Sequence, residues 1–129
     1  MAMNQHAVRD PVWASPAWPD RLPDPSDMKV VYGPIADELV IRFHRDRHVD
    51  TLVVPITTPA IDYAGVLTSF SSGAVVGIHV YPLLAFAIQR HPLWSPLAEQ
   101  NPPPGSIVRI VEEIKELFDR YGVGDPNPE

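Results

Sequence analysis

Proline most restricts what this chain can fold into, since 16 of its 129 residues are proline. Each proline fixes its own backbone angle and disfavours helix in the residue before it. Five of them fall in the first 27 residues, so we predict that residues 1–27 form an extended arm outside the main domain. The arm carries Trp13 and Trp18, whose indoles are expected to lie over the domain surface. The alternative is a linear motif that docks in a partner's groove.

Alternation of apolar and polar residues in the first two thirds of the domain predicts five β-strands. Pro55 cannot donate a hydrogen bond to a neighbouring strand, so we place it at a sheet edge or a bulge. Residues 71–73, Ser-Ser-Gly, are expected to form a short hairpin loop with the glycine at positive φ. The five predicted strands are 28–32, 39–43, 52–56, 61–70 and 74–81.

The last predicted strand, residues 74–81, differs from the others because both of its faces are rich in apolar residues. We place Val76, Ile78 and Val80 on one face. Apolar side chains on both faces indicate a central strand that is covered on both sides. The polar run at residues 44–48 is predicted to be a hairpin connection between the second and third strands.

The first predicted helix begins at Pro82 and stops before Pro92, because proline suits the first turn of a helix and ends one elsewhere. Its side chains are apolar nearly all round. A short helix of that kind lies deep in the core or in a subunit interface. The candidate interface residues are Leu83, Leu84, Phe86 and Ile88, together with Trp13 and Trp18 of the arm.

A second helix is predicted after the proline-rich loop at residues 92–105, which holds Trp94. Ser106 is its expected N-cap, and Gly122 follows its end. Apolar residues three and four positions apart give this helix one buried stripe opposite a charged face. Residues 123–129 are predicted to be a disordered tail. The stripe consists of Ile107, Ile110, Val111, Ile114, Leu117, Phe118 and Tyr121.

Together these elements predict one α+β domain over residues 28–122. It consists of an antiparallel meander of about five strands, followed by a short apolar helix and a C-terminal amphipathic helix. The long helix should pack across one face of the sheet. The other face and the short apolar helix then lack a cover, which a second copy of the chain would supply. The sequence therefore predicts a homodimer.

The charge and the missing cysteines exclude several classes of function. Lys plus Arg is 10 and Asp plus Glu is 16, so the net charge of −6 argues against general binding to nucleic acid or anionic lipid. Without cysteine there is no disulfide, thiolate metal site or cysteine nucleophile. The N-terminus lacks the pattern of a signal peptide, and His79 and Pro82 interrupt the longest apolar stretch. We expect a cytoplasmic protein with no membrane association and no cofactor.

Residues 28–82 resemble a small bacterial family, the domain of unknown function 2283. Its members begin with a strand, a tyrosine, a turn, an Ala-Asp pair and an alternating strand, and a glycine turn precedes a later hydrophobic strand. The resemblance implies a β-rich fold, and it implies no activity and no functional residue. This chain departs from the family in its long helical C-terminal part. The matching residues are Tyr32, Ala36, Asp37, Leu39, Ile41 and Phe43, then Gly73 and the run Val75 to Val80.

His79 is the main candidate for a ligand or catalytic site, because it is the histidine that lies within a predicted strand. The simpler interpretation is a hydrogen-bonded histidine in the core. The alternative is a general acid or base beside Asp62 or Tyr81, or part of a pocket shared with Trp94. A concave apolar pocket that holds His79 would distinguish the two interpretations.

The polar run after the second predicted strand holds the remaining candidates. His44 and His48 have the spacing of two zinc ligands on a helix, but they flank a turn here, and no carboxylate pattern completes a metal site. Arg42, Arg45 and Arg47 make this run the only basic cluster in the sequence. It is a candidate site for a phosphate or an acidic partner.

No catalytic motif is present, so the leading hypothesis is a homo-oligomeric module for protein interaction. The first alternative is a small-molecule-binding protein or enzyme with a pocket between sheet and helices near His79. The second is a regulator linked to nucleic acid through the Arg42 to His48 hairpin, which would bind with strong salt dependence.

Overall fold

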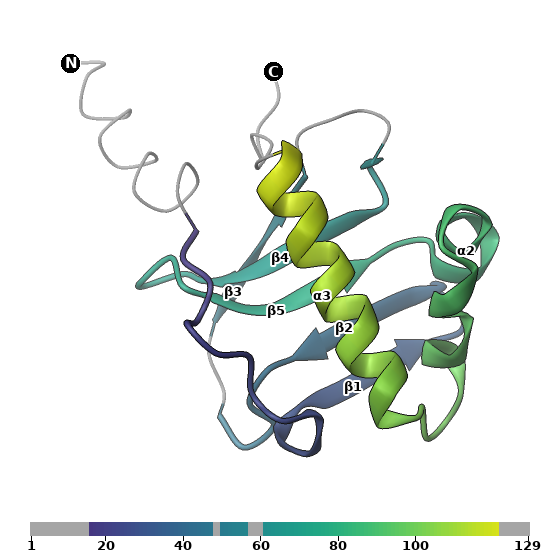
Figure 1. Ribbon diagram of the computed structural model, residues 1–129, viewed down its shortest axis with the longest axis horizontal. Coiled ribbons are helices and arrows are strands. Elements are labelled where there is room, and N and C mark those ends of the chain that lie inside the picture. The colour runs from purple at the N-terminus through teal and green to yellow at the C-terminus, as the bar shows by residue number, and fades with distance from the viewer. Residues whose placement is uncertain (1–15, 48–49, 57–60, 122–129) are drawn as a thin grey trace.

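The computed structural model confirms the α+β class, because five antiparallel strands form one sheet and helical segments follow it (Figure 1). The structure describes residues 16–47, 50–56 and 61–121. The strands are β1 (Lys29–Gly33), β2 (Glu38–Arg42), β3 (Thr51–Pro55), β4 (Ala64–Ser69) and β5 (Val75–Val80). The helical segments are 3₁₀ helices at Pro25–Asp27 and Pro92–Ala98, a π-helical turn at Leu83–Ala87, α2 (Ile88–Arg90) and α3 (Pro104–Tyr121).

The order of the strands across the sheet is β1-β2-β5-β4-β3, which is not a simple meander. The predicted hairpin connection at residues 44–48 is wrong, because β2 pairs with β5 and not with β3. Two predicted positions within the sheet are confirmed. Pro55 lies on the edge strand β3, and the strand predicted to be central, β5, is the middle strand. In a meander β3 would be central, where Pro55 would interrupt the hydrogen bonds.

One β-bulge corrects the predicted faces of β5. Its register against β4 shifts between Leu67 and Thr68, where an extra residue enters the strand. As a result Val75 joins Ile78 and Val80 in the core, and Val76, predicted on that face, is only half-buried and lies outside the core cluster. The loop before the bulge follows the prediction, since Gly73 has a φ of 75°.

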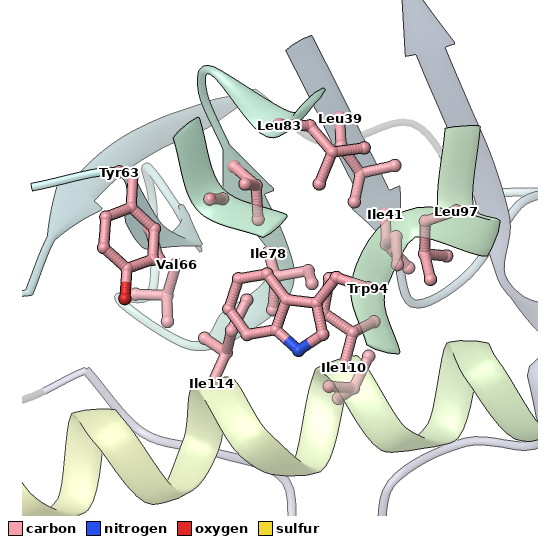
Figure 2. Packing of buried hydrophobic residues seen from close by; sticks show 14 of the residues in the cluster. Leu39, Ile41, Tyr63, Val66, Ile78, Leu83, Trp94, Leu97, Ile110 and Ile114 are labelled. Carbon is pink, nitrogen blue, oxygen red and sulfur yellow. The ribbon is translucent and has the colours of Figure 1, made fainter. Parts of the chain in front are cut away.

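The core lies between the sheet and α3, and Trp94 fills its middle. Figure 2 shows the indole of Trp94 between the strands and the helix, beside Ile78, Ile110 and Ile114. All four side chains are fully buried. Burial of this kind stabilises the fold by about 1.5–3 kcal/mol for each large side chain. Trp94 belongs to the 3₁₀ helix Pro92–Ala98, so the prediction of an irregular loop over residues 92–105 is wrong there.

The C-terminal helix forms as predicted but begins earlier. It starts at Pro104, and the amide of Ser106 already donates to the Pro103 carbonyl, so Ser106 lies in the first turn and is not the N-cap. Proline suits this first position because its missing N–H has no partner there in any helix. Tyr121, predicted in the buried stripe, is 43% exposed. Gly122 and the predicted tail 123–129 lie outside the described residues.

The part of the N-terminal arm that the structure describes crosses the same side of the sheet as α3 (Figure 1). Ala17 forms a parallel bridge with Ala74. Trp18 packs against Phe43 and Phe118, with ring centroids 6.1 and 5.8 Å away. The indole of Trp18 therefore lies against its own domain, as predicted. Trp13 lies outside the described residues.

Candidate functional site

The sheet has one covered face and one open face. In each strand the core residues alternate with residues whose side chains point away from α3, and strand pairing aligns the latter in rows across the sheet. One row runs from Val31 through Val40, His79 and Gly65 to Pro55. We call this surface the open face, and it consists of Lys29, Val31, Glu38, Val40, Arg42, Thr51, Val53, Pro55, Gly65, Leu67, Gly77 and His79.

The open face carries apolar and charged residues, and the valines of its outer strands are exposed. Val31 on β1 is 47% exposed and Val53 on β3 is 40% exposed, although Leu67 between them is buried. In Figure 1, α3 and the N-terminal segment cross the opposite side of the sheet. Among the described residues, no helix covers the open face. A surface of β-branched side chains without a cover is typical of a protein interface.

His79 lies near the middle of the open face and is bonded to Glu38. The Nε2 atom of His79 lies 2.6 Å from Oε2 of Glu38, and the side chains are 19% and 44% exposed. Because β2 pairs with β5, the pair joins adjacent strands. An ionised carboxylate can only accept, so the histidine donates this bond and partly compensates the charge of Glu38.

A shallow hollow on the open face brings together two of the three predicted ligand-site residues. His79 and Tyr81 line it with Asp62, and its volume is about 140 Å³. Trp94 is absent because it is fully buried on the other side of the sheet. Ligand pockets usually measure about 300–1,000 Å³, so the hollow has room for a side chain and too little for most metabolites. The other lining residues are Val53, Pro55, Tyr63, Ala64 and Gly65.

A polar network inside the helical layer was not predicted from the sequence. Trp94 Nε1 donates to Oε1 of Glu113 at 2.7 Å. His91 stacks on the Trp94 ring with centroids 3.9 Å apart, and its Nε2 atom lies 2.7 Å from the Tyr63 hydroxyl. Burial raises the pKa of Tyr63 and lowers the pKa of His91. These contacts join the residue before β4, the residue after α2, the 3₁₀ helix Pro92–Ala98 and α3, so we assign the network to the core. Glu113 flanks the apolar stripe of α3, which is the one signal that the sequence offered.

Asp37 links the β1–β2 turn to the segment after β5 through hydrogen bonds. It has a φ of 58°, and its carboxylate accepts from the Tyr32 hydroxyl at 2.6 Å and from the amides of Leu84 and Ala85 at 2.8 and 2.9 Å. The hydrogen bond to Asp37 raises the pKa of Tyr32 to about 12. Burial acts to raise the pKa of Asp37, but the bonds it accepts lower it overall. Tyr32 and Asp37 are two of the residues that carry the family resemblance.

The residues predicted for a subunit interface are only partly at the surface. Leu83 is fully buried in its own core, and Leu84 is 42% exposed. Phe86 and Ile88 are half-buried and pack against the core. The short apolar helix therefore belongs mainly to the domain itself. Its exposed part is small beside the open face.

Three residues of the predicted basic cluster lie close together in the structure. Arg42, His44 and Arg47 line one small hollow together with Val76. Arg45 is tied down instead, because its Nη2 atom donates to the Met28 carbonyl at 2.6 Å. His48 lies outside the described residues. Within the described ranges, no group of three or more His, Asp or Glu side chains is arranged to hold a metal ion.

Comparison with family models, curated proteins and solved structures finds no match to this chain. The resemblance of residues 28–82 to domain of unknown function 2283 therefore stays a prediction. Among the described residues, no helix combines the length and the apolar composition needed to cross a lipid bilayer.

Proposed function

We propose that this protein is a homodimeric interaction module without enzymatic activity, and that two copies associate through their open faces. The observation that carries this proposal is a five-stranded sheet whose described helices all lie on one side, with Val31 and Val53 exposed on the other. Burying such a surface against a second copy removes apolar area from water, which favours association.

The size of the open face fits a modest affinity. Five strands spaced about 4.8 Å apart, each about five residues long, span roughly 24 by 17 Å, or about 400 Å² for each copy. The side chains project from this flat surface, so the accessible area that two copies bury is larger than the flat area. It approaches the lower end of specific interfaces, which bury about 1,200 Å² in total over both partners. We therefore expect a dissociation constant in the micromolar range rather than a permanent dimer.

Charge selects how the two copies face each other. Arg42 and Glu38 lie at opposite ends of β2 and point to the open face. A two-fold axis perpendicular to the strands reverses the strand direction, so Arg42 of each copy faces Glu38 of the other. An axis parallel to the strands and centred on β5 would place β2 over β4 of the other copy and leave these charges without opposite partners. The module is therefore an antiparallel stack of two sheets.

The two alternative functions have weaker support. The hollow beside His79 holds about 140 Å³, which is too small for most small-molecule ligands. The arginine-rich turn also carries Asp27 and Asp46 at its wider hollow, and these carboxylates would repel a nucleic-acid backbone. Neither alternative function involves Val31 and Val53, which are exposed on the open face.

Sedimentation velocity over protein concentrations from about 1 to 300 μM tests the proposal. The wild-type chain should change from monomer to dimer over this range. A double variant with Val31→Lys and Val53→Lys should remain monomeric, because two desolvated ammonium groups oppose the stacking of each copy. Both valines are exposed, so the variant should fold.

Leu84→Lys is the matched control, because Leu84 is exposed to a similar degree on the helical side. It should dimerise like the wild type. A dimer that survives the double valine variant and is lost in Leu84→Lys would contradict the open-face proposal and would return the interface to the short apolar helix.

A further inference from the structure

We propose that Arg42, His44 and Arg47 bind the phosphate group of a small phosphorylated molecule. The three residues line one hollow of about 20 Å³ beside Val76, so a phosphate would lie across its mouth rather than inside it. Among the described residues, none of the three side chains has an ion pair or a hydrogen bond. In a chain with a net charge of −6, two guanidinium groups that lie together without an ion pair among the described residues form a local positive potential that attracts an anion.

The backbone around these side chains is held in place before any ligand arrives. The amide of Arg45 donates to the Asp27 carbonyl at 2.8 Å, and its side chain donates to the Met28 carbonyl at 2.6 Å. The amide of Arg47 donates to the carbonyl of His44 at 3.1 Å, which closes the turn. Arg45 thus anchors the turn that presents the other side chains. Because this turn is already ordered, binding costs less conformational entropy.

The chemistry of the three groups matches a phosphate. A guanidinium donates two parallel hydrogen bonds to a phosphate, and such charge-assisted bonds are about twice as strong as neutral ones. Arg42 has space at its side because its partner in the β2–β5 register is Gly77, which has no side chain. His44 adds a further donor.

A wider hollow of about 260 Å³ shares His44 and Arg47 with the first one, and we assign the organic part of a small ligand to it. His44 and Arg47 line it together with Asp27, Arg45 and Asp46. The two carboxylates accept hydrogen bonds from hydroxyl or amino groups and repel a second phosphate. The site therefore fits a phosphomonoester with a polar organic part, and it disfavours a polyanion such as nucleic acid.

The phosphate site shares only Arg42 with the open face, so the test uses Arg47, which the homodimer does not need. The wild-type chain is titrated with inorganic phosphate and with glucose 6-phosphate at constant ionic strength, and the backbone amide signals are followed by NMR. Both probes should give saturable shifts confined to residues 42–47 and 76. Arg47→Gln should weaken binding about tenfold or more, as expected for a charge-assisted hydrogen bond.

Arg120→Gln is the matched control, since it removes an exposed arginine from the far end of α3 and should leave both affinities unchanged. Shifts that do not saturate, shifts that sodium chloride reproduces, or equal losses in both variants would overturn the phosphate site. Equal affinity for the two probes would keep the phosphate site and overturn the role given to the wider hollow. A homodimer that fails to form would leave these results unaffected.

Discussion

At the scale of single residues, two tryptophans with similar surroundings make different contributions to the fold. Trp94 is fully buried and its indole N–H donates to Glu113. Trp18 is half-buried, and its indole nitrogen is buried without a hydrogen-bond partner in the described part of the chain. An unpaired buried donor carries a desolvation penalty, whereas a bond to a charged acceptor contributes about 1.5–3 kcal/mol.

We predict that Trp94→Phe lowers the free energy of unfolding by about 3 kcal/mol, because it opens a cavity and removes the bond to Glu113. Trp18→Phe should cost less than about 1 kcal/mol, since losing an unpaired N–H offsets part of the lost packing. Urea denaturation of both variants checks this difference. Equal losses would contradict the assigned role of the Trp94–Glu113 bond.

His91 should make stability depend on pH. Burial lowers its pKa, Glu113 opposes this shift and Arg90 adds to it, while Tyr63 and Trp94 complete its surroundings. Between the lowered folded-state pKa and the ordinary value of about 6.5, the unfolded chain binds more protons than the folded one. The free energy of unfolding should therefore fall as the pH decreases from about 7 to about 5. His91→Gln should make that decrease shallower, and parallel curves for both proteins would contradict this account.

At the scale of elements, the sequence carried two signals about the strand order that the predicted meander did not combine. Pro55 indicated an edge strand, and the apolar faces of residues 74–81 indicated a central one. A meander satisfies neither placement, because it makes the third strand central and the fifth an edge. An order with β3 at an edge and β5 in the middle satisfies both, and the structure has such an order, with β5 between β2 and β4. Two local signals were correct where the default topology was wrong.

Other features lay beyond the sequence because they depend on register. The His79–Glu38 bond joins residues 41 positions apart, and the Tyr63–His91 contact joins residues 28 apart. The first requires the β2–β5 register, and the second requires the packing of the helical layer against the sheet. Of the predicted site residues, His79 and Tyr81 line one hollow, and Trp94 lies in the other layer.

A pair of glycine variants tests the packing of β5 against β2. A Cβ atom at residue 77 would collide with the backbone carbonyl of Ile41, and neither strand can yield without breaking their pairing. We predict that Gly77→Ala lowers the free energy of unfolding by about 2–3 kcal/mol. Gly105→Ala, with nothing within 4 Å of the added atom, should raise it by about 0.5 kcal/mol. Thermal unfolding of both variants measures this, and a tolerated Gly77→Ala would contradict the close approach.

At the scale of the whole molecule, the sequence predicted a missing cover, and the structure changes where that cover is needed. The short apolar segment is tied to Asp37 and buries Leu83, so most of its apolar surface is already used. The open face retains its exposed valines. We therefore expect a second copy to cover the sheet rather than the short helix. The opposite charges at the two ends of β2 give this dimer an orientation.

The most direct test of this account is a charge-swap mixing experiment followed by native mass spectrometry. Arg42→Glu alone and Glu38→Arg alone should each weaken self-association about tenfold or more, because each places like charges together twice in the dimer. Mixing the two variants should restore a dimer that contains one copy of each, since both contacts then pair opposite charges. A mixture that stays monomeric while the wild type dimerises would contradict the antiparallel open-face dimer.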